Sequence, residues 1–513
     1  MQHSKHLSLA GKPLSFADLA RIGQRSVSLA ADEASMVRVD TARQVVEDKI
    51  ARGEQVYGAT TGVGAMKDVE WSPEQLEEFN LGLVRAHHFG TGVPFPNSIV
   101  RNAMAIRVNT ALTGRVGCSR GLVNAYLDLL DKDVVPVVRR TGSIGTADIG
   151  LMGQIGAVLT GVGEAVYNNK RMSAEAALAQ AGLRPSRMAP RDSLASISVN
   201  AVGFAAAAEA TRAAASAVRM LLATSLTTAG ALGASRDPWK AVAHVGTERE
   251  AEIGAWMYRN AMGWDWPNAT HIQDNLSLRM MAQVFGATFD TLLVAGRTIL
   301  AATGRTDDNP VVVDNQVLTS GGSLPLDVTI YLQAAQIALA HVARNSFNRC
   351  VLLSNGTRRN LPINLVPPGA IATGFGPIIK LAGELFARVL SMSGSISAQS
   401  MVVAAGIEDE AAFLPLVVER FERQVRALRR LAALEGLLSA QAMDIHGDRP
   451  SGVPGLIYSK VRQHAAYYEV DRPLSVEVEI IESDIGSEHS MAELISLAPI
   501  PSLDEFFALG PVA

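Results

Sequence analysis

Four short stretches of this 513-residue chain combine side chains that can move protons or bind anions with small, flexible residues. They read Y-G-A-T-T-G-V-G at 57–64, N-L-G-L-V-R-A-H-H-F-G-T-G at 80–92, Q-D-N-L-S-L-R at 273–279 and T-D-D-N-P at 306–310. A tyrosine acts as a base near neutral pH only if positive charge or hydrogen-bond donors lower its pKa. An arginine can hold a carboxylate through two parallel hydrogen bonds, a geometry that lysine cannot copy.

Motifs typical of metal or nucleotide enzymes are missing from the sequence. It contains no phosphate-binding loop, and G-Q-I-G at 153–156 lacks the context of a dinucleotide fold. His87 and His88 are adjacent, so on a helix they point in different directions and cannot grip one metal ion together. Because H-E-x-x-H and paired-cysteine spacings are also missing, a metal site is disfavoured.

Charge and cysteine content narrow the class of protein. The chain has 46 basic and 50 acidic residues. No run of Lys or Arg exceeds two residues, which disfavours nucleic acid or an anionic membrane as a partner. The first twenty residues hold no apolar core long enough for a signal peptide. Cys118 and Cys350 cannot form a disulfide framework, so we expect a protein of the reducing cytoplasm.

Helical periodicity dominates the second half of the chain. Hydrophobic residues make up 48%, mostly Ala, Leu and Val, a mixture that suits closely packed helices and further burial between subunits. In 417–438 the apolar residues fall three or four positions apart. Further apolar segments at helical spacing are 97–131, 151–168, 201–230, 275–302, 327–353 and 374–393. Alternation typical of strands is confined to short pieces such as 311–318 and 474–481. The predicted fold class is mainly α, a bundle of long helices.

The most apolar stretch of the chain, 201–234, is long enough to span a membrane. Three charged residues, Glu209, Arg212 and Arg219, lie within it and would be costly there. We therefore expect a buried helix in a protein with no membrane partner.

Loops rich in Gly, Thr, Asn and Asp punctuate the helices at 57–64, 139–148, 304–310 and 319–325. Loops on a rigid frame are where chemistry usually occurs. We predict a loop-rich N-terminal active-site domain over 1–200. A central long-helix bundle with a C-terminal helical region would then occupy 201–513.

The four stretches, in this order and rough spacing, resemble the histidine and phenylalanine ammonia-lyase family. That family carries Y-G-x-x-T-G-F-G, a later S-H-x-x-G, then Q-D-x-Y-S-x-R and T-D-N-P, and S-G-G at 320–322 follows here as expected. The resemblance covers essentially the whole chain. It implies an all-α bundle of the fumarase/aspartase-like type and a homotetramer whose active sites draw on three subunits. The implied reaction removes an α-amino group and a β-proton from a small amino-acid substrate.

The family's key device is an electrophilic prosthetic group, methylidene-imidazolone (MIO), formed from an Ala-Ser-Gly triad within G-S-x-G-A-S-G-D-L. The corresponding stretch here is G-S-I-G-T-A-D-I, one residue shorter. Ring closure needs a middle hydroxyl that is lost as water and a third residue without a Cβ that would clash. Thr146, Ala147 and Asp148 supply neither, so we expect no MIO and no other cofactor.

Loss of the electrophile changes the expected substrate. Ammonia is a poor leaving group, and the electrophile exists to improve it. A trimethylammonium group already carries its charge and departs as a neutral amine. Within the superfamily the chain looks like ergothionase, which eliminates trimethylamine from ergothioneine to give thiourocanate without that prosthetic group. We therefore predict elimination of trimethylamine from an aromatic or heteroaromatic amino-acid betaine.

The resemblance also assigns individual roles. Tyr57 matches the catalytic tyrosine that abstracts the β-proton; the alternative is a buried tyrosine at a turn. His87 matches the histidine on the ring side of the substrate, and His88 is expected to pack. Arg279 matches the arginine that pairs with the substrate carboxylate; the alternative is a structural ion pair.

Three further polar positions match the family's site. They are Gln273, Asn309 and the asparagine of L-A-L-x-N, for which either Ser198 or, with a gap, Asn200 is the counterpart; we favour Asn200. The tyrosine of Q-D-x-Y-S is Leu276 here, a second departure from the family.

A last pair of residues would lie at the ring end of the substrate. Where histidine lyases have G-F-M followed 32 positions later by a glutamate, this chain has Gly376 in place of the methionine and Glu408 as the glutamate. Lys380 comes one helical turn after Gly376, so its ammonium could fill the vacated space. A Lys380–Glu408 pair would stabilise charge that develops on the ring. The alternative for Lys380 is an ion pair with Glu384.

Two other functions stay open from the sequence. One is a histidine-type ammonia-lyase or aminomutase that forms the electrophile from an unexpected triad. The other is a binding homologue that kept the fold and lost catalysis, which the retained Tyr57, Arg279 and Glu408 disfavour.

Overall fold

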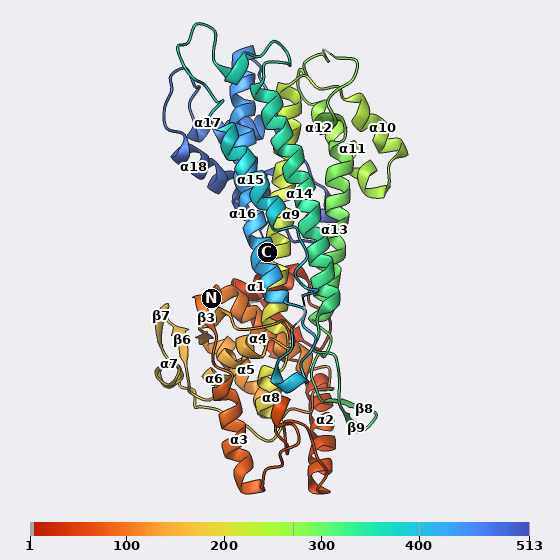
Figure 1. The fold of residues 1–513 in the computed structure, drawn as a ribbon, viewed down its shortest axis with the longest axis vertical. Coiled ribbons are helices and arrows are strands. Elements are labelled where there is room, and N and C mark those ends of the chain that lie inside the picture. Colours follow the sequence, from red (N-terminus) through yellow and green to blue (C-terminus); the bar gives the residue numbers. More distant parts are fainter. Residues whose placement is uncertain (1–4, 270, 400, 512–513) are drawn as a thin grey trace. The chain divides into compact units, whose positions relative to one another are not determined.

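A computed structural model describes residues 5–269, 271–399 and 401–511. Helices dominate it, which confirms the mainly α class (Figure 1). The chain forms two compact units, each built from several segments. Unit 1 holds residues 1–209, 297–330 and 395–418, and unit 2 holds 210–296, 331–394 and 419–513. The predicted division at residue 200 into separately organised domains stays a prediction.

Unit 1 contains both helices and short strands. Its helices are α1 (Phe16–Gly23), α2 (Glu33–Ala51), α3 (Pro73–Ala86), α4 (Asn97–Ala111), α5 (Arg120–Lys132), α6 (Ile149–Leu159), α7 (Ala174–Gln180) and α8 (Asp192–Ile197). Strands β1 (Lys5–Leu9) and β2 (Val27–Ala31) pair in parallel. Antiparallel pairs join β3 (Thr91–Pro94) to β5 (Arg139–Thr141), and β6 (Glu164–Tyr167) to both β4 (Val135–Pro136) and β7 (Lys170–Ser173). A hairpin of β8 (Val311–Val313) and β9 (Gln316–Leu318) completes the set and confirms the strand prediction for 311–318.

Four long helices contribute residues to both units. They are α9 (Ala201–Ala231), α13 (Met281–Ala302), α14 (Leu326–Ser354) and α16 (Leu414–His446). Unit 2 adds α10 (Asp237–Val245), α11 (Glu248–Ala261), α12 (Leu276–Arg279), α15 (Ile379–Ser391), α17 (Gly452–His464), α18 (Ser475–Ile485), α19 (Glu488–Leu497) and α20 (Pro501–Asp504). Three 3-10 turns lie at Gly64–Met66, Ile363–Leu365 and Ala404–Gly406.

The apolar stretch at 201–234 is a buried helix, as predicted. In the span Asp192–Ala231, 94% of the most apolar window is buried inside the protein. The charge of Arg219 is accommodated by an ion pair with Asp504, with Nε to Oδ1 at 3.1 Å. The hydroxyls of Thr224 and Thr228 bond the carbonyls four residues earlier, so these polar groups are satisfied within the helix.

Two other helices are long and apolar enough to cross a membrane by length and composition alone. In α13 and α14 only 50% and 56% of the most apolar window is buried. Their uncovered apolar residues include Val294, Ile330 and Ile337. Such half-covered helices are consistent with the predicted burial between subunits.

The strand prediction for 474–481 was wrong, because this segment forms α18. Its buried residues Val478, Ile481 and Ile485 fall three and four positions apart, while Val476 and Ile480 are exposed. β-Branched residues suggested a strand, but packing of one helical face overrode local propensity.

Two predicted helix ranges also need correction. The segment 97–131 is broken into α4 and α5, since Gly114 and Gly117 adopt positive φ values between them. The helix predicted over 151–168 ends at Leu159, and the chain continues into β6.

Candidate active site

A cavity of about 960 Å³ lies within unit 1. Its walls come from the Tyr57 loop and the turn after it, α3, the 146–149 segment, α8, Asn309, the 319–324 loop and the 404–410 loop. Six of the predicted site residues line it: Tyr57, His87, Thr146, Ala147, Asn309 and Glu408. Segments more than 350 positions apart in the chain, such as those of Tyr57 and Glu408, thus meet around one space.

Tyr57 lies at a turn whose glycines bring the backbone close to its side chain. Its hydroxyl oxygen accepts a hydrogen bond from the backbone N–H of Gly64 at 3.0 Å. A Cβ on Gly58 would lie 2.1 Å from a Leu194 methyl carbon, so only glycine fits there. Burial, together with the negative charge of Glu408, raises the pKa of Tyr57 above its ordinary value despite the Gly64 bond. The positive charge of Arg191 acts in the opposite direction but does not offset these effects.

Glu408 projects into the cavity from the 404–410 loop. A Cβ on Gly64 would lie 3.8 Å from Glu408 Oε1, which places the carboxylate beside the turn that holds the Tyr57 hydroxyl. Backbone hydrogen bonds in both directions between Val403 and Glu408 close this loop. Tyr57 and Glu408 thus face one space, as the predicted base and the predicted ring-binding group would have to.

His87 caps the end of α3 and lines the cavity. Its Nδ1 lies 2.7 Å from the carbonyl oxygen of Leu83, which can only accept, so Nδ1 carries a proton. In the neutral ring Nε2 is then an acceptor. Gly153 packs so tightly on the His87 backbone that a Cβ would lie 2.3 Å from its carbonyl oxygen. His88 instead packs against Gly163, as expected.

The segment that corresponds to the family's triad is held rigidly on one wall. The N–H of Ala147 donates to Ser323 O, and Ala147 O accepts from the N–H of Val199, both at 3.0 Å. The Thr146 hydroxyl donates to Glu410 O at 3.1 Å. Ala147 has a φ of 61°, a strained value for a residue with a side chain.

Asp148 is fully buried behind this wall. Its carboxylate accepts hydrogen bonds from the Ser143 hydroxyl and from the N–H of Gly203, both at 2.7 Å. Burial without a cationic partner raises the pKa of Asp148 to about 6. At this point the family has a glycine followed by an aspartate, and this chain is one residue shorter. Asp148 stands there, and its buried carboxyl group has a structural role at the start of α6.

Asn309 lines the cavity, whereas Asn200 does not. The Asn309 Oδ1 accepts from the N–H of Ser320 at 2.8 Å. Asn200 is buried, and its Nδ2 donates to Asp307 Oδ2 and to Ser323 O, each at 2.8 Å. Of the two alternatives weighed from the sequence, Ser198 is the one that reaches the cavity wall. A substrate-binding role for Asn200 stays a prediction.

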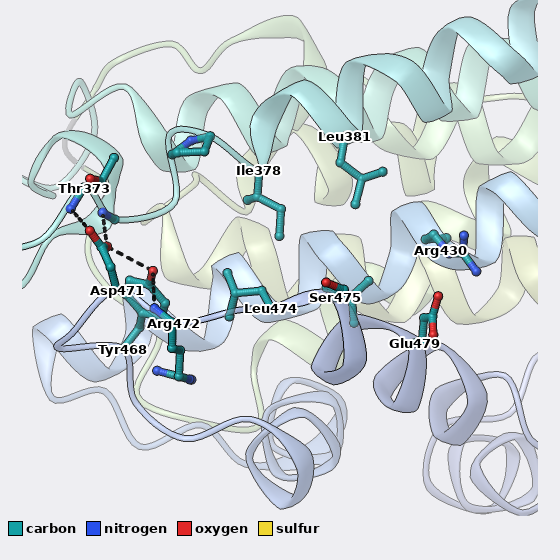
Figure 2. A pocket seen from close by; sticks show the side chains of 13 residues that line it. Thr373, Ile378, Leu381, Arg430, Tyr468, Asp471, Arg472, Leu474, Ser475 and Glu479 are labelled. Carbon is teal, nitrogen blue, oxygen red and sulfur yellow. Dashed lines mark hydrogen bonds between the residues drawn. The ribbon is translucent and has the colours of Figure 1, made fainter.

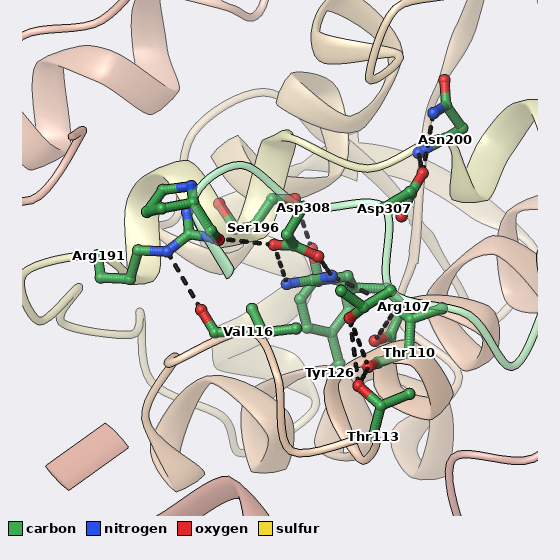
Figure 3. A network of polar contacts seen from close by, with 12 residues as sticks. Arg107, Thr110, Thr113, Val116, Tyr126, Arg191, Ser196, Asn200, Asp307 and Asp308 are labelled. Carbon is green, nitrogen blue, oxygen red and sulfur yellow. Dashed lines mark hydrogen bonds and ion pairs between the residues drawn. The ribbon is translucent and has the colours of Figure 1, made fainter. Parts of the chain in front are cut away.

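A buried network behind the cavity explains the charged pair in T-D-D-N-P (Figure 3). Arg107 binds Asp308 through two bonds, 2.8 and 3.1 Å long, and Arg191 adds a third of 3.1 Å. All three side chains are at most 1% exposed. Burial opposes the charge on Arg107, but the Asp308 carboxylate raises the pKa of this guanidinium above its ordinary value.

Asp307, the residue before Asp308, has a different environment. Its Oδ2 accepts from both the backbone N–H and the side-chain amide of Asn200, each at 2.8 Å (Figure 3). Burial, and then the negative charge of Asp308, raises the pKa of Asp307 to about 7. T-D-D-N-P was predicted as a site motif. The sequence alone does not show which of its two aspartates pairs with arginine.

Three predicted residues belong to unit 2. The Gln273 carboxamide faces the Arg279 guanidinium, and with its oxygen turned toward the donors it accepts bonds of 2.7 and 3.0 Å. Arg279 lies at the end of α12, with a buried Nε that has no partner among the described residues. Lys380 is exposed in the first turn of α15.

The space next to Gly376 is not vacant. A Cβ there would lie 2.6 Å from the carboxamide of Asn364, so this side chain fills the place predicted for the Lys380 ammonium. Gly376 also precedes the start of α15, so it does not share a helical face with Lys380. The predicted alternative partner, Glu384, pairs with Arg388 instead.

Sequence reasoning missed several residues of the cavity wall. Trp71 and Phe79 line it, with ring centroids 5.3 Å apart and nearly parallel planes. Asp409 and Glu410 add two carboxylates beside Glu408. The only sequence signal was their closeness to the Y-G-A-T-T-G-V-G stretch and to Glu408.

A second cavity, of about 650 Å³, lies within unit 2 (Figure 2). Its Asp471 carboxylate accepts from the backbone N–H groups of Thr373 and Gly374 and from the Tyr468 hydroxyl. Arg430 and Arg472 pair with Glu482 and Glu477. The two arginines and Asp471 of this cavity are thus engaged in ion pairs or hydrogen bonds, and Glu479 completes its charged lining.

A family model of aromatic amino acid lyases matches residues 14–465. The chain belongs to the aromatic amino acid lyase family. It is similar to histidine ammonia-lyases of Yersinia enterocolitica (29% identity over 97% of this chain and 100% of the relative) and Burkholderia vietnamiensis (28% over 95% and 98%). It is therefore an enzyme, a carbon–nitrogen lyase of the ammonia-lyase and aminomutase group.

Solved structures extend this comparison. Ergothionase from Treponema denticola, an ergothioneine-degrading enzyme, superposes with a TM-score of 0.89 at 27% identity, over 93% of this chain and 98% of that one. Histidine ammonia-lyase from Trypanosoma cruzi shares the fold, with a TM-score of 0.84 at 22% identity over 99% and 96%. The predicted all-α lyase fold is thereby confirmed.

Proposed function

We propose that this aromatic amino acid lyase works without MIO and eliminates trimethylamine from a heteroaromatic amino-acid betaine, with ergothioneine as the leading substrate. One observation carries the proposal. Ala147 has no hydroxyl to lose, and Asp148 has a buried, hydrogen-bonded carboxyl group where ring formation needs glycine. The residues at this wall do not fit the group that activates an amino nitrogen. The leaving group must then be activated in the substrate.

The chemistry of the elimination follows from the cavity. The Tyr57 phenolate takes the β-proton, the electrons of the C–H bond form the Cα=Cβ double bond, and the C–N bond breaks with its electron pair on neutral trimethylamine. The raised pKa of Tyr57 favours a substrate with a permanent positive charge, because such a charge lowers that pKa when it binds. The ammonium group of a free amino acid, by contrast, can lose its positive charge by deprotonation.

The cavity walls suit a cationic substrate. Glu408, Asp409 and Glu410 supply three carboxylates, while the one lysine of the wall, Lys67, pairs with Asp68. Trp71 and Phe79 add aromatic surface, which attracts quaternary ammonium groups.

Groups that bind the substrate carboxylate and ring complete the proposal. Arg279, oriented by Gln273, is suited to hold the carboxylate through two bonds. Glu408 would bind the ring, with Lys380 as its cationic counterpart, and His87 and Asn309 would position the substrate. We propose that Arg279, Gln273 and Lys380 reach the cavity from other copies of the chain in a cytoplasmic homotetramer.

The similarity to histidine ammonia-lyases favours a second candidate function. Relatives at 28–29% identity carry that name, so release of ammonia from histidine, or an aminomutase reaction, is the alternative. Either reaction requires the MIO electrophile. The segment 146–148 has neither the middle hydroxyl nor the glycine from which MIO forms. A binding protein without catalysis would have no need to keep Tyr57 and Glu408 facing one cavity.

A substrate panel separates these functions. The protein is incubated with ergothioneine, hercynine and histidine, and trimethylamine, ammonia and the unsaturated acid are measured. Trimethylamine from a betaine, without ammonia from histidine, supports the proposal. Ammonia from histidine overturns the proposal. If none of the three compounds gives a product, the binding homologue is supported instead.

A further inference from the structure

A basic cavity of about 620 Å³ lies in unit 1, separate from the active-site residues. Four cationic side chains line it, and none of its lining residues carries a carboxylate. They are Lys12, Arg38, Arg115 and Arg305, from four separate segments. Three hydroxyl residues, Thr113, Thr306 and Ser320, line it as well. A wall with several cations, hydroxyl groups and no acid is the electrostatic complement of an anion.

The segments that carry these cations are fixed by a buried amide. Asn109 is fully buried, and its Oδ1 accepts from the N–H of Gly11 at 3.0 Å. Its Nδ2 donates to Lys12 O at 2.7 Å and to Thr303 O at 2.8 Å. A single side chain thus joins the N-terminal segment, α4 and the loop that carries Arg305.

Close backbone approaches make the same rim rigid. A Cβ on Gly304 would lie 2.3 Å from the backbone nitrogen of Pro13, so this crossing requires glycine. The hydroxyls of Thr113 and Thr306 are hydrogen-bonded to each other at 3.2 Å. The N–H of Val312 donates to Arg115 O at 2.8 Å and anchors the segment that carries this arginine. The cations therefore project from a preorganised frame, which lowers the entropic cost of binding.

The four cations differ in how far their charge is already balanced. Arg38 donates through Nη2 to two carbonyls, Ala10 O and Leu112 O, each at 3.1 Å. Arg305 pairs with Asp327 at 3.0 Å on the exposed surface. Within the described part of the chain, neither Lys12 nor Arg115 forms an ion pair. The Asp32 carboxylate interacts with the charges of Lys12 and Arg38. The four cations thus have two neighbouring carboxylates, Asp32 and Asp327, and the cavity keeps an excess of positive charge.

We propose that this cavity binds a compact polyanion, a small molecule with two or more phosphate or carboxylate groups. Guanidinium groups match both anions through paired hydrogen bonds. The volume exceeds what a single phosphate fills, and the cations come from separate segments, so a ligand with several anionic groups satisfies more of them at once. This site does not depend on the proposed lyase reaction.

The site is joined to the active-site cavity through one residue. Ser320 lines the basic cavity, and its N–H donates to the Oδ1 of Asn309, which lines the active-site cavity. The Ser320 hydroxyl also accepts from the N–H of Gly322. A bound polyanion that pulls on Ser320 changes the position of Asn309, so polyanion and substrate affinities are coupled reciprocally.

Calorimetric titration of the full-length protein with pyrophosphate and with citrate, at low ionic strength, tests the site. The wild-type protein is expected to bind at least one of them, and Arg115→Gln to bind it at least tenfold more weakly. Lys12→Gln is a second variant of an exposed side chain, with the same expectation. Arg187→Gln, which removes an exposed arginine of unit 1 away from this cavity, is the matched control and should bind as the wild type does.

Which of the two anions binds identifies phosphate or polycarboxylate as the preferred class. The site is refuted if neither binds, or if Arg115→Gln and Lys12→Gln bind as tightly as the control. The coupling is measured separately, as a change of at least twofold in the KM of whichever substrate the enzyme turns over when the anion is saturating. Binding with an unchanged KM refutes the coupling and leaves the site intact.

Discussion

The hydroxyl of Tyr57 accepts a hydrogen bond from the backbone N–H of Gly64, and Glu408 faces the same glycine from the opposite loop. The Gly64 donor favours the phenolate, but burial and the Glu408 charge outweigh it and raise the pKa of Tyr57. In the proposed mechanism, a positively charged substrate lowers this pKa and so favours the phenolate. This relationship ties the identity of the base to the charge of the substrate.

Replacing Tyr57 with Phe should remove elimination while leaving substrate binding nearly intact. A positioned general base typically contributes about 100- to 10,000-fold, so kcat should fall by at least about 100-fold with little change in the dissociation constant. Single-turnover kinetics with ergothioneine measures the first quantity and calorimetry the second. Elimination at the wild-type rate would show that another group takes the proton.

The raised pKa of Asp307 predicts how stability depends on pH. Its folded-state pKa of about 7 lies above the ordinary value of 3.8, so the folded protein binds this proton more tightly than the unfolded chain. The stabilisation is complete below about pH 4 and is lost as pH rises toward 7. Asp307→Asn cannot lose a proton, so its melting temperature relative to the wild type should rise between pH 5 and pH 8.

A matched control for that series is Asp314→Asn, an exposed residue in the turn between β8 and β9. Its melting temperature should follow the wild type at every pH. If Asp307→Asn also follows the wild type, the carboxyl group is not protonated in the folded state.

Asp308 balances two buried arginines, so its loss should be costly. Asp308→Asn keeps the shape but leaves Arg107 and Arg191 with uncompensated charge. Removing one partner of a buried ion pair costs about 3–5 kcal/mol of unfolding free energy. Denaturant unfolding measures the loss. Asp40→Asn, which removes one of the two acidic partners of Arg120 on the exposed surface, should have a much smaller effect, and equal losses would contradict this expectation.

Much of the fold followed from patterns along the chain. The periodicity of 417–438 predicted α16, and three charges in the Ala-rich stretch correctly argued for the buried helix α9. The strand prediction for 474–481 failed because alternating β-branched residues also fit a helix with one buried face. Which pattern applies depends on the neighbours that cover the segment.

The site was predictable where a motif carried it and not where packing decided it. Tyr57, His87 and Glu408 meet in one cavity although they are far apart in sequence. The filling of the space at Gly376 by Asn364 could not be foreseen, because no periodicity links these two loop residues. The protonation of Asp307 likewise depends on burial and on Asp308, which are properties of the folded chain.

Release of trimethylamine from ergothioneine by borohydride-treated protein distinguishes elimination without MIO from catalysis that depends on it. Borohydride reduces an electrophilic prosthetic group and abolishes catalysis that depends on it. The account predicts trimethylamine and an unsaturated acid at the same rate before and after treatment, with no ammonia from histidine in either case. Ammonia release from histidine that disappears on borohydride treatment would contradict it.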